Sequence, residues 1–152
     1  MSSLAIETLA AGSVTQQATG RLLVDTNGPG FTELTEAVSR WVFASGILQG
    51  LLTVHCRHTS ASLLIQENAD PDVRLDLMTV LDRLAPRGAG YVHTTEGADD
   101  MPAHIRSMLT ASSLGIPVLD GQMVLGLWQG IYLLEHRDRE QTRDVVFHLI
   151  GA

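Results

Sequence analysis

The sequence predicts an α+β fold with mainly antiparallel, sandwich-like sheets and two or three helices. Runs with strand character come in groups, and segments with helical spacing lie between the groups instead of alternating strictly with single strands. The carboxyl-terminal part, about forty residues, has strand character almost throughout. A length of 152 residues fits one domain, and no repeat or long linker divides it, so we expect a single domain over 1–152.

The first elements are predicted from partial alternation and then from helical spacing. Residues 4–9 and 13–24 carry Thr, Val and Leu in partial alternation, which predicts an opening antiparallel pair. From Phe31 the apolar residues recur at helical spacing, with Thr32 as a candidate cap and Gly46 as a left-handed stop. The first helix is therefore expected from Phe31.

Two strands and a second helix are predicted in the middle of the chain. Residues 47–57 alternate so that Leu52, Val54 and Cys56 share one face, and 62–67 form a second apolar run. A helix is expected from Asp70-Pro71, because the carboxylate can cap free amides and a proline costs nothing in the first turn.

The remaining elements are short. Tyr91-Val92 is predicted as a short strand, and a short helix is expected after Pro102. Asp120-Gly121 is a two-residue hairpin signal between apolar runs. Strands near 127–135 and 144–150 complete the chain.

Composition excludes several classes of protein. Hydrophobic residues make up 45% and charged residues only 18%, which favours a subunit that hides surface in an oligomer. All ten basic residues are Arg, so a Schiff-base lysine and a Gly-Lys phosphate loop are excluded. The net charge of −7 argues against binding to nucleic acid, which needs a basic face.

The cysteine count and the apolar segments bear on location. One cysteine, Cys56, excludes a disulfide within the chain and a multi-cysteine zinc site. The start of the chain lacks a secretory signal, and the longest apolar stretch, 123–134, is too short to span a bilayer. We therefore expect a soluble, cytoplasmic protein without a membrane partner.

Four histidines lie at or near the ends of predicted elements, with carboxylates close by in sequence. These are His58, His93, His104 and His136, and the carboxylates are Glu67, Glu96, Asp99, Asp100 and Glu135. Such a set suits a divalent metal or a proton-transfer site. The alternative interpretation is histidines bonded to backbone in the core. His104 lies in a first helical turn, which favours the neutral, metal-binding form.

Polar residues near these histidines suggest an anion. Hydroxyls follow His58 at Thr59 and Ser60. The guanidinium groups of Arg57 and Arg106 could each bind phosphate through two parallel hydrogen bonds. The acidic loop at 96–100 could hold magnesium through water, or could simply cap a helix.

Four blocks in order carry a family resemblance. They are His58-Thr-Ser-Ala-Ser, then Glu67-Asn-Ala-Asp-Pro71, then Glu96-Gly-Ala-Asp-Asp-Met-Pro-Ala-His104, and finally Gly126-Leu-Trp-Gln-Gly-Ile131 with Glu135-His136-Arg137. The chain resembles the YjbQ-like family, labelled secondary thiamine-phosphate synthase. The resemblance implies a homotrimer with clefts at subunit boundaries. It also implies an activity that joins a pyrimidine diphosphate to a thiazole phosphate and releases pyrophosphate.

The resemblance, together with the chemistry of the neighbouring residues, suggests roles for individual residues. Expected catalytic residues are His58, Glu67 and His104. Expected metal ligands are His58 and His104, completed by either His93 or His136, with magnesium or zinc as the ion. Expected contacts to a small phosphorylated substrate are Arg57, Thr59, Ser60, Asn68 and Arg106. The alternatives are a metal-binding or anion-binding trimer without turnover and a metal-dependent phosphohydrolase.

Overall fold

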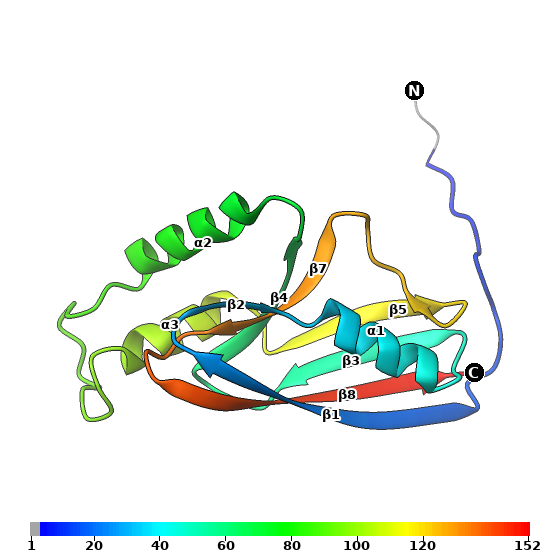
Figure 1. The fold of residues 1–152 in the computed structure, drawn as a ribbon. Helices are drawn as coiled ribbons and strands as arrows, with labels where there is room; N and C mark the ends of the chain where they lie inside the picture. Colours follow the sequence, from blue (N-terminus) through cyan, green and yellow to red (C-terminus); the bar gives the residue numbers. More distant parts are fainter. Residues whose placement is uncertain (1–3) are drawn as a thin grey trace.

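Two antiparallel sheets form the body of the protein in the computed structural model, which describes residues 4–152 (Figure 1). The five strands of the larger sheet are, in spatial order, β1 (Gln16–Asn27), β8 (Glu140–Gly151), β3 (Gly50–Cys56), β5 (Ser113–Leu119) and β6 (Gln122–Met123). The smaller sheet has the order β2 (Gly30–Glu33), β7 (Gln129–Glu135) and β4 (Ala61–Glu67). The predicted α+β class is confirmed.

The main core lies between the sheets and beneath α1 (Thr35–Ala44). Leu52 and Val54 of β3 have no exposed surface, as their alternation predicted. They belong to one cluster with Val38 of α1 and Leu133 of β7. The cluster thereby joins both sheets to the helix, and its burial from water is the main source of stability.

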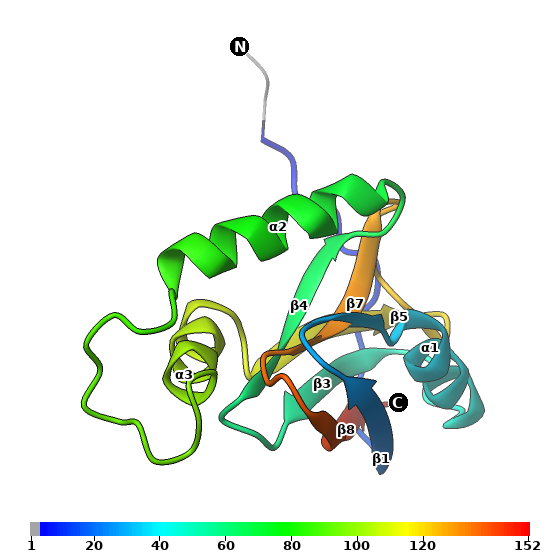
Figure 2. The same cartoon turned by 60° about the vertical axis from the view of Figure 1, so that its left-hand side comes forward.

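Two further helices lie on the other side of the smaller sheet from α1 (Figure 2). They are α2 (Pro71–Leu84) and α3 (Asp100–Leu109). The Asp70 carboxylate caps α2 by accepting a hydrogen bond from the Asp72 amide at 2.9 Å, as predicted. Leu81 and Met78 of α2 pack with Tyr132 of β7 in a small second cluster. Among the residues described, no helix is long and apolar enough to cross a membrane.

Three predicted elements are wrong. Residues 4–15 form no strand, and β1 instead pairs along its whole length with β8. Residues 30–33 pair with β7 as β2, so the first helix begins at Thr35 and Thr32 does not cap it. Tyr91-Val92 lies in a loop. In each case a pairing partner, or the lack of one, outweighs the local pattern.

Two predictions from backbone chemistry are confirmed. Gly46 follows α1 with φ of +72°, a left-handed conformation that glycine adopts without strain. Asp120 and Gly121 have φ of 51° and 72°, which turns the chain sharply between β5 and β6. Positive φ at both positions is the signature of a tight hairpin turn.

Candidate metal centre and neighbouring polar clusters

Three side chains that can bind a metal converge at the first turn of α3. His93 Nε2 lies 2.6 Å from Asp100 Oδ2, and His104 Nε2 lies 3.2 Å from the same oxygen. One possible ligand atom from each of the three residues lies within 4.8 Å of the other two. Of the four predicted metal ligands, the structure brings together His93 and His104.

Helix geometry and a glycine-containing loop place these three groups. Asp100 and His104 are four residues apart on α3, so their side chains project from the same face. His93 comes from the loop that joins α2 to α3. Gly97 in this loop has φ of +107°, and a Cβ there would come within 2.9 Å of Asp99 Oδ1. Glycine therefore allows the loop to turn back tightly onto the start of α3.

Arg137 fixes the acidic side of the centre. Its Nη1 donates to Asp100 Oδ1 at 2.5 Å, and its Nε donates to Asp99 Oδ2 at 2.8 Å. Burial alone would raise the pKa of Asp100, but the hydrogen bond with His93 and the charge of Arg137 lower it overall. Asp100 is therefore an anion with one oxygen held by Arg137 and the other turned toward the two imidazoles.

The centre is open to solvent on its histidine side. The Asp100 side chain is 5% exposed, while those of His93 and His104 are 41% and 34% exposed. A hollow of about 400 Å³ adjoins it, lined by His93, Thr94 and Met101 among others. A small molecule can therefore approach the imidazoles without any movement of the core.

His58 belongs to a different cluster at the end of β3. Its Nε2 accepts a hydrogen bond from the Asp144 amide at 2.7 Å, and its Nδ1 lies 3.4 Å from Arg143 Nη1. Arg143 in turn forms a buried ion pair with Glu135, with an Nε to Oε2 distance of 2.6 Å. Within this chain, His58 thus joins a cluster of arginines and carboxylates instead of the group at α3.

His136 lies in a third cluster and is 2% exposed. Its Nε2 is 2.8 Å from Ser62 Oγ, and Thr110 Oγ1 is 2.6 Å from the same hydroxyl. In residues 4–152 its Nδ1 has no hydrogen-bond partner. Burial, followed by the positive charge of Arg106, lowers the pKa of His136 to about 4. This ring is therefore neutral at physiological pH and buried in the core, with the Ser62 hydroxyl and not the backbone as its partner.

The other predicted site residues are distributed over the smaller sheet and α3. Glu67 and Asn68 lie at the far end of β4, about 20 Å along the strand from the end near His58. Arg106 is buried, and its Nη2 donates to Asp82 Oδ1 at 2.7 Å. Glu67 therefore lies away from His58 within this chain, and Arg106 has an internal carboxylate as its partner.

The predicted polar residues beside His58 do remain near it. Arg57 Nη1 donates to Asp144 Oδ2 at 2.9 Å. Ser60 contributes its carbonyl and its hydroxyl oxygen as acceptors for Arg143 Nη2, at 3.2 and 3.1 Å. Thr59 is exposed between them. The turn after β3 thus keeps the hydroxyls and arginine that suggested an anion.

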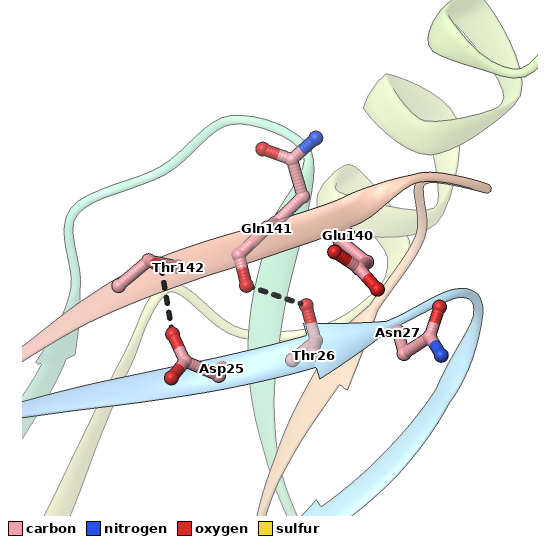
Figure 3. Close-up of a pocket in the computed structure, with 6 residues that line it drawn as sticks. All are labelled: Asp25, Thr26, Asn27, Glu140, Gln141 and Thr142. Atoms are coloured by element: carbon pink, nitrogen blue, oxygen red, sulfur yellow. Dashed lines mark hydrogen bonds between the residues drawn. The ribbon is translucent and has the colours of Figure 1, made fainter.

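A further groove lies at one end of the β1 and β8 ribbon (Figure 3). Its six lining residues include Asp25 and Glu140, and Thr142 Oγ1 donates to Asp25 Oδ1 at 2.7 Å. Figure 3 shows Thr26 directed toward the Gln141 carbonyl, 3.3 Å away. No basic side chain lines this groove within residues 4–152, so it does not suit a phosphorylated ligand.

Sequence reasoning missed the parts played by Asp100, Arg137 and Arg143. In the sequence Asp100 belongs to the acidic loop, although its separation of four residues from His104 is a usable signal on a helix. The two arginines gave no such signal. Each acts on residues far away in the sequence, Arg137 on α3 and Arg143 on the turn after β3.

Comparisons with known proteins agree on one family. The family model described as UPF0047 protein YjbQ-like matches residues 21–152. A UPF0047 protein from Synechocystis is 50% identical over 131 residues, which cover 86% of this chain and 89% of that protein. A YjbQ/UPF0047 crystal structure from Clostridium acetobutylicum is 35% identical, with a TM-score of 0.75, and covers 89% of this chain and 99% of that one.

A crystal structure from Sulfolobus solfataricus shares the fold. Its TM-score is 0.81 at 19% identity, and the match covers 90% of this chain and 100% of that one. That protein is described as being of unknown function, and the Clostridium protein is described as uncharacterized. The likeness at this low identity supports the architecture.

These findings overturn the predicted activity. The matching family model and the Synechocystis relative carry a family number and no reaction, and two structural relatives are described as lacking a known function. The expectation of a thiamine-phosphate synthase, and with it the assignment to thiamine biosynthesis, is therefore wrong. The matches in sequence and fold do establish kinship, and the chain belongs to the YjbQ-like family, UPF0047.

Proposed function

We propose that this protein binds one divalent transition-metal ion, with zinc as the best fit, through His93, Asp100 and His104. The observation that carries the proposal is the convergence of two imidazole nitrogens and one carboxylate oxygen within 4.8 Å. A metal would replace the contacts that Asp100 Oδ2 makes with the two rings, since the same atoms are its ligands.

The chemistry of the donor atoms favours zinc over magnesium. Magnesium prefers oxygen ligands and keeps several waters, whereas imidazole nitrogen suits zinc and its neighbours in the transition series. Three protein ligands leave at least one position free, as in catalytic zinc sites. When bound, such an ion supplies Lewis acidity and lowers the pKa of a water that it holds.

The surroundings support a fixed and selective site. Arg137 holds the second oxygen of Asp100 and also binds Asp99, so the carboxylate is oriented before any metal arrives. The hollow beside His93 gives an incoming group access to the open side. A preorganised, partly open centre is suited to binding a small ligand at the metal.

Calorimetric titration of chelator-treated protein with zinc tests the proposal. We expect one site per chain that binds zinc more tightly than magnesium and is lost in His93→Ala and His104→Ala. The matched control is His55→Ala, because His55 is exposed on β3 and does not belong to the three converging side chains. Zinc binding that is unchanged in both site variants would contradict the proposal.

We also propose that copies of this chain associate, with the homotrimer implied by the family resemblance as the expected state. Apolar side chains of α2 support association, since Leu75, Val80 and Leu84 are 64%, 45% and 58% exposed. Sedimentation equilibrium tests the trimer, and a monomer at micromolar concentration would contradict it. The cytoplasmic location and a small phosphorylated substrate stay predictions.

A further inference from the structure

The guanidinium group of Arg143 is buried, rigid and incompletely satisfied. Its side chain is 4% exposed. Nε and Nη2 donate to the two oxygens of Glu135, and Nη2 also donates to the carbonyl and hydroxyl oxygens of Ser60. The remaining nitrogen, Nη1, has one hydrogen-bond contact among the described residues, with His58 Nδ1 at 3.4 Å. The satisfaction of Nη1 therefore depends on the protonation of His58.

The backbone decides which nitrogen of His58 carries the proton. The Asp144 amide donates to Nε2 at 2.7 Å, so Nε2 must present a lone pair. In a neutral ring the proton then lies on Nδ1, which makes Nδ1 a donor that faces another donor. Burial and then the charge of Arg143 lower the pKa of His58, which agrees with a neutral ring. The contact between Arg143 and His58 is thus a pair of donors without an acceptor.

Ser60 adds a third donor. Its hydroxyl oxygen accepts from Arg143 Nη2 at 3.1 Å, and among residues 4–152 its own hydrogen has no acceptor. An oxygen about 2.9 Å from both Nη1 and Nδ1 would satisfy two donors at once, since those nitrogens are 3.4 Å apart. A group with several oxygens could satisfy all three.

The charges around the three donors favour an anion. The Glu135 carboxylate accepts from Arg143. The Asp144 carboxylate accepts hydrogen bonds from Arg21 Nη2 and Arg57 Nη1, each at 2.9 Å. Three guanidinium groups therefore meet two carboxylates, which leaves one positive charge in a protein whose net charge is −7. His58 and Ser60 are half-buried with Thr59 exposed between them, so the turn can be reached from solvent.

We propose that Arg143, His58 and Ser60 form a binding site for a tetrahedral oxyanion, phosphate or sulfate, either free or as the terminal group of a small molecule. Arginine and neutral N–H and O–H donors are the groups that recognise such an anion. The site shares no residue with the centre at His93, Asp100 and His104. It therefore does not need the metal, and the two proposals can fail separately.

Titration calorimetry of the full chain with inorganic phosphate, and separately with sulfate, tests the site in the presence of a chelator. The informative variants are Ser60→Ala and His58→Gln. In His58→Gln the side-chain oxygen can still accept from the Asp144 amide, while the N–H at the position of Nδ1 is lost. The matched controls are His55→Gln and Ser113→Ala, because His55 and Ser113 form a similar exposed pair at 2.5 Å elsewhere. Phenyl phosphate in place of inorganic phosphate separates a site for an ester from one for the free ion.

We expect saturable phosphate binding in the wild type and a loss of at least about tenfold in affinity in each variant. Both controls, and His104→Ala, should bind phosphate as the wild type does. Circular dichroism and thermal unfolding establish that each variant is folded, and Ser60→Ala retains the Glu135 pair if His58→Gln does not fold. The proposal is overturned if neither anion and no ester binds saturably, or if Ser60→Ala binds phosphate as tightly as the wild type.

Discussion

Asp100 Oδ2 lies 3.2 Å from His104 Nε2, one helical turn further along α3. The same oxygen lies 2.6 Å from His93 Nε2, which comes from the preceding loop. The carboxylate thereby joins a helix face to a loop, and both imidazoles depend on it for their position. The proposed centre therefore takes two of its residues from α3 and the third from the loop before it.

Asp100→Asn should lower zinc affinity by more than about a hundredfold, because it removes an anionic ligand and weakens the hold on both rings. Calorimetric titration with zinc measures the loss. Asp76→Asn is the matched control, since Asp76 is an exposed helical carboxylate on α2. Equal affinities in the two variants would show that Asp100 is not a ligand.

Arg137→Gln should reduce zinc affinity by about tenfold to a hundredfold, although Arg137 itself binds no metal. The reason is that Arg137 orients Asp100 and ties it to Asp99. Arg87→Gln removes an exposed arginine that pairs with Asp138 nearby and should leave the affinity unchanged. The same zinc titration checks both, and a wild-type affinity for Arg137→Gln would argue against this orienting role.

Arg143→Met should lower the free energy of unfolding by about 3 to 5 kcal/mol, because it leaves the Glu135 carboxylate charged and buried. The side chains of Arg143 and Glu135 are 4% and 1% exposed. Arg57→Met removes an arginine whose side chain is 59% exposed and should cost at most about 1 kcal/mol. Urea unfolding compares the two variants. Similar losses of unfolding free energy would contradict the larger contribution assigned to the buried pair.

The free energy of unfolding should fall as pH drops from about 7 to about 5, and His136 should account for part of this loss. The pKa of His136 is lowered to about 4 in the folded protein, against an ordinary value of 6.5. As the pH falls, His136 takes up a proton in the unfolded chain before it does so in the folded protein. Its contribution to stability is therefore complete above the pKa of the unfolded chain, and is lost as the pH falls toward the pKa of the folded protein. Over this interval the contribution of His136 is about 2 kcal/mol.

Urea unfolding at the two pH values measures this contribution of His136. His136→Phe keeps a ring but cannot titrate, so the difference in unfolding free energy between the two pH values should shrink by about 2 kcal/mol. His55→Gln, at an exposed position, should preserve the wild-type difference. An unchanged difference in His136→Phe would mean that His136 does not resist protonation.

Local chemistry made part of the fold predictable from sequence. The cap at Asp70 and the turn at Asp120-Gly121 follow from side-chain hydrogen bonding and positive φ, which depend on few neighbours. The strand at residues 4–9 and the helix from Phe31 failed for the opposite reason. Their patterns fit the predicted elements, but distant pairing of β1 with β8 and of β2 with β7 determined the outcome.

The candidate site was predictable only where its parts are close in sequence. Only the end of one loop and the first turn of α3 separate His93 from His104, so the proximity of the two rings follows from local geometry. His58 and His136 end strands of different sheets, and the arginines and hydroxyls that surround them come from remote segments. Residue type identified four histidines of interest, but only the tertiary fold could divide them among three clusters.

Anomalous diffraction at the zinc absorption edge, from crystals of zinc-loaded protein, tests the central claim most directly. The account predicts one strong peak per chain about 2.0 to 2.1 Å from Nε2 of both His93 and His104, with an Asp100 oxygen at a similar distance. A fully loaded crystal with no peak between these three side chains, or with its zinc held by other residues, would contradict the account.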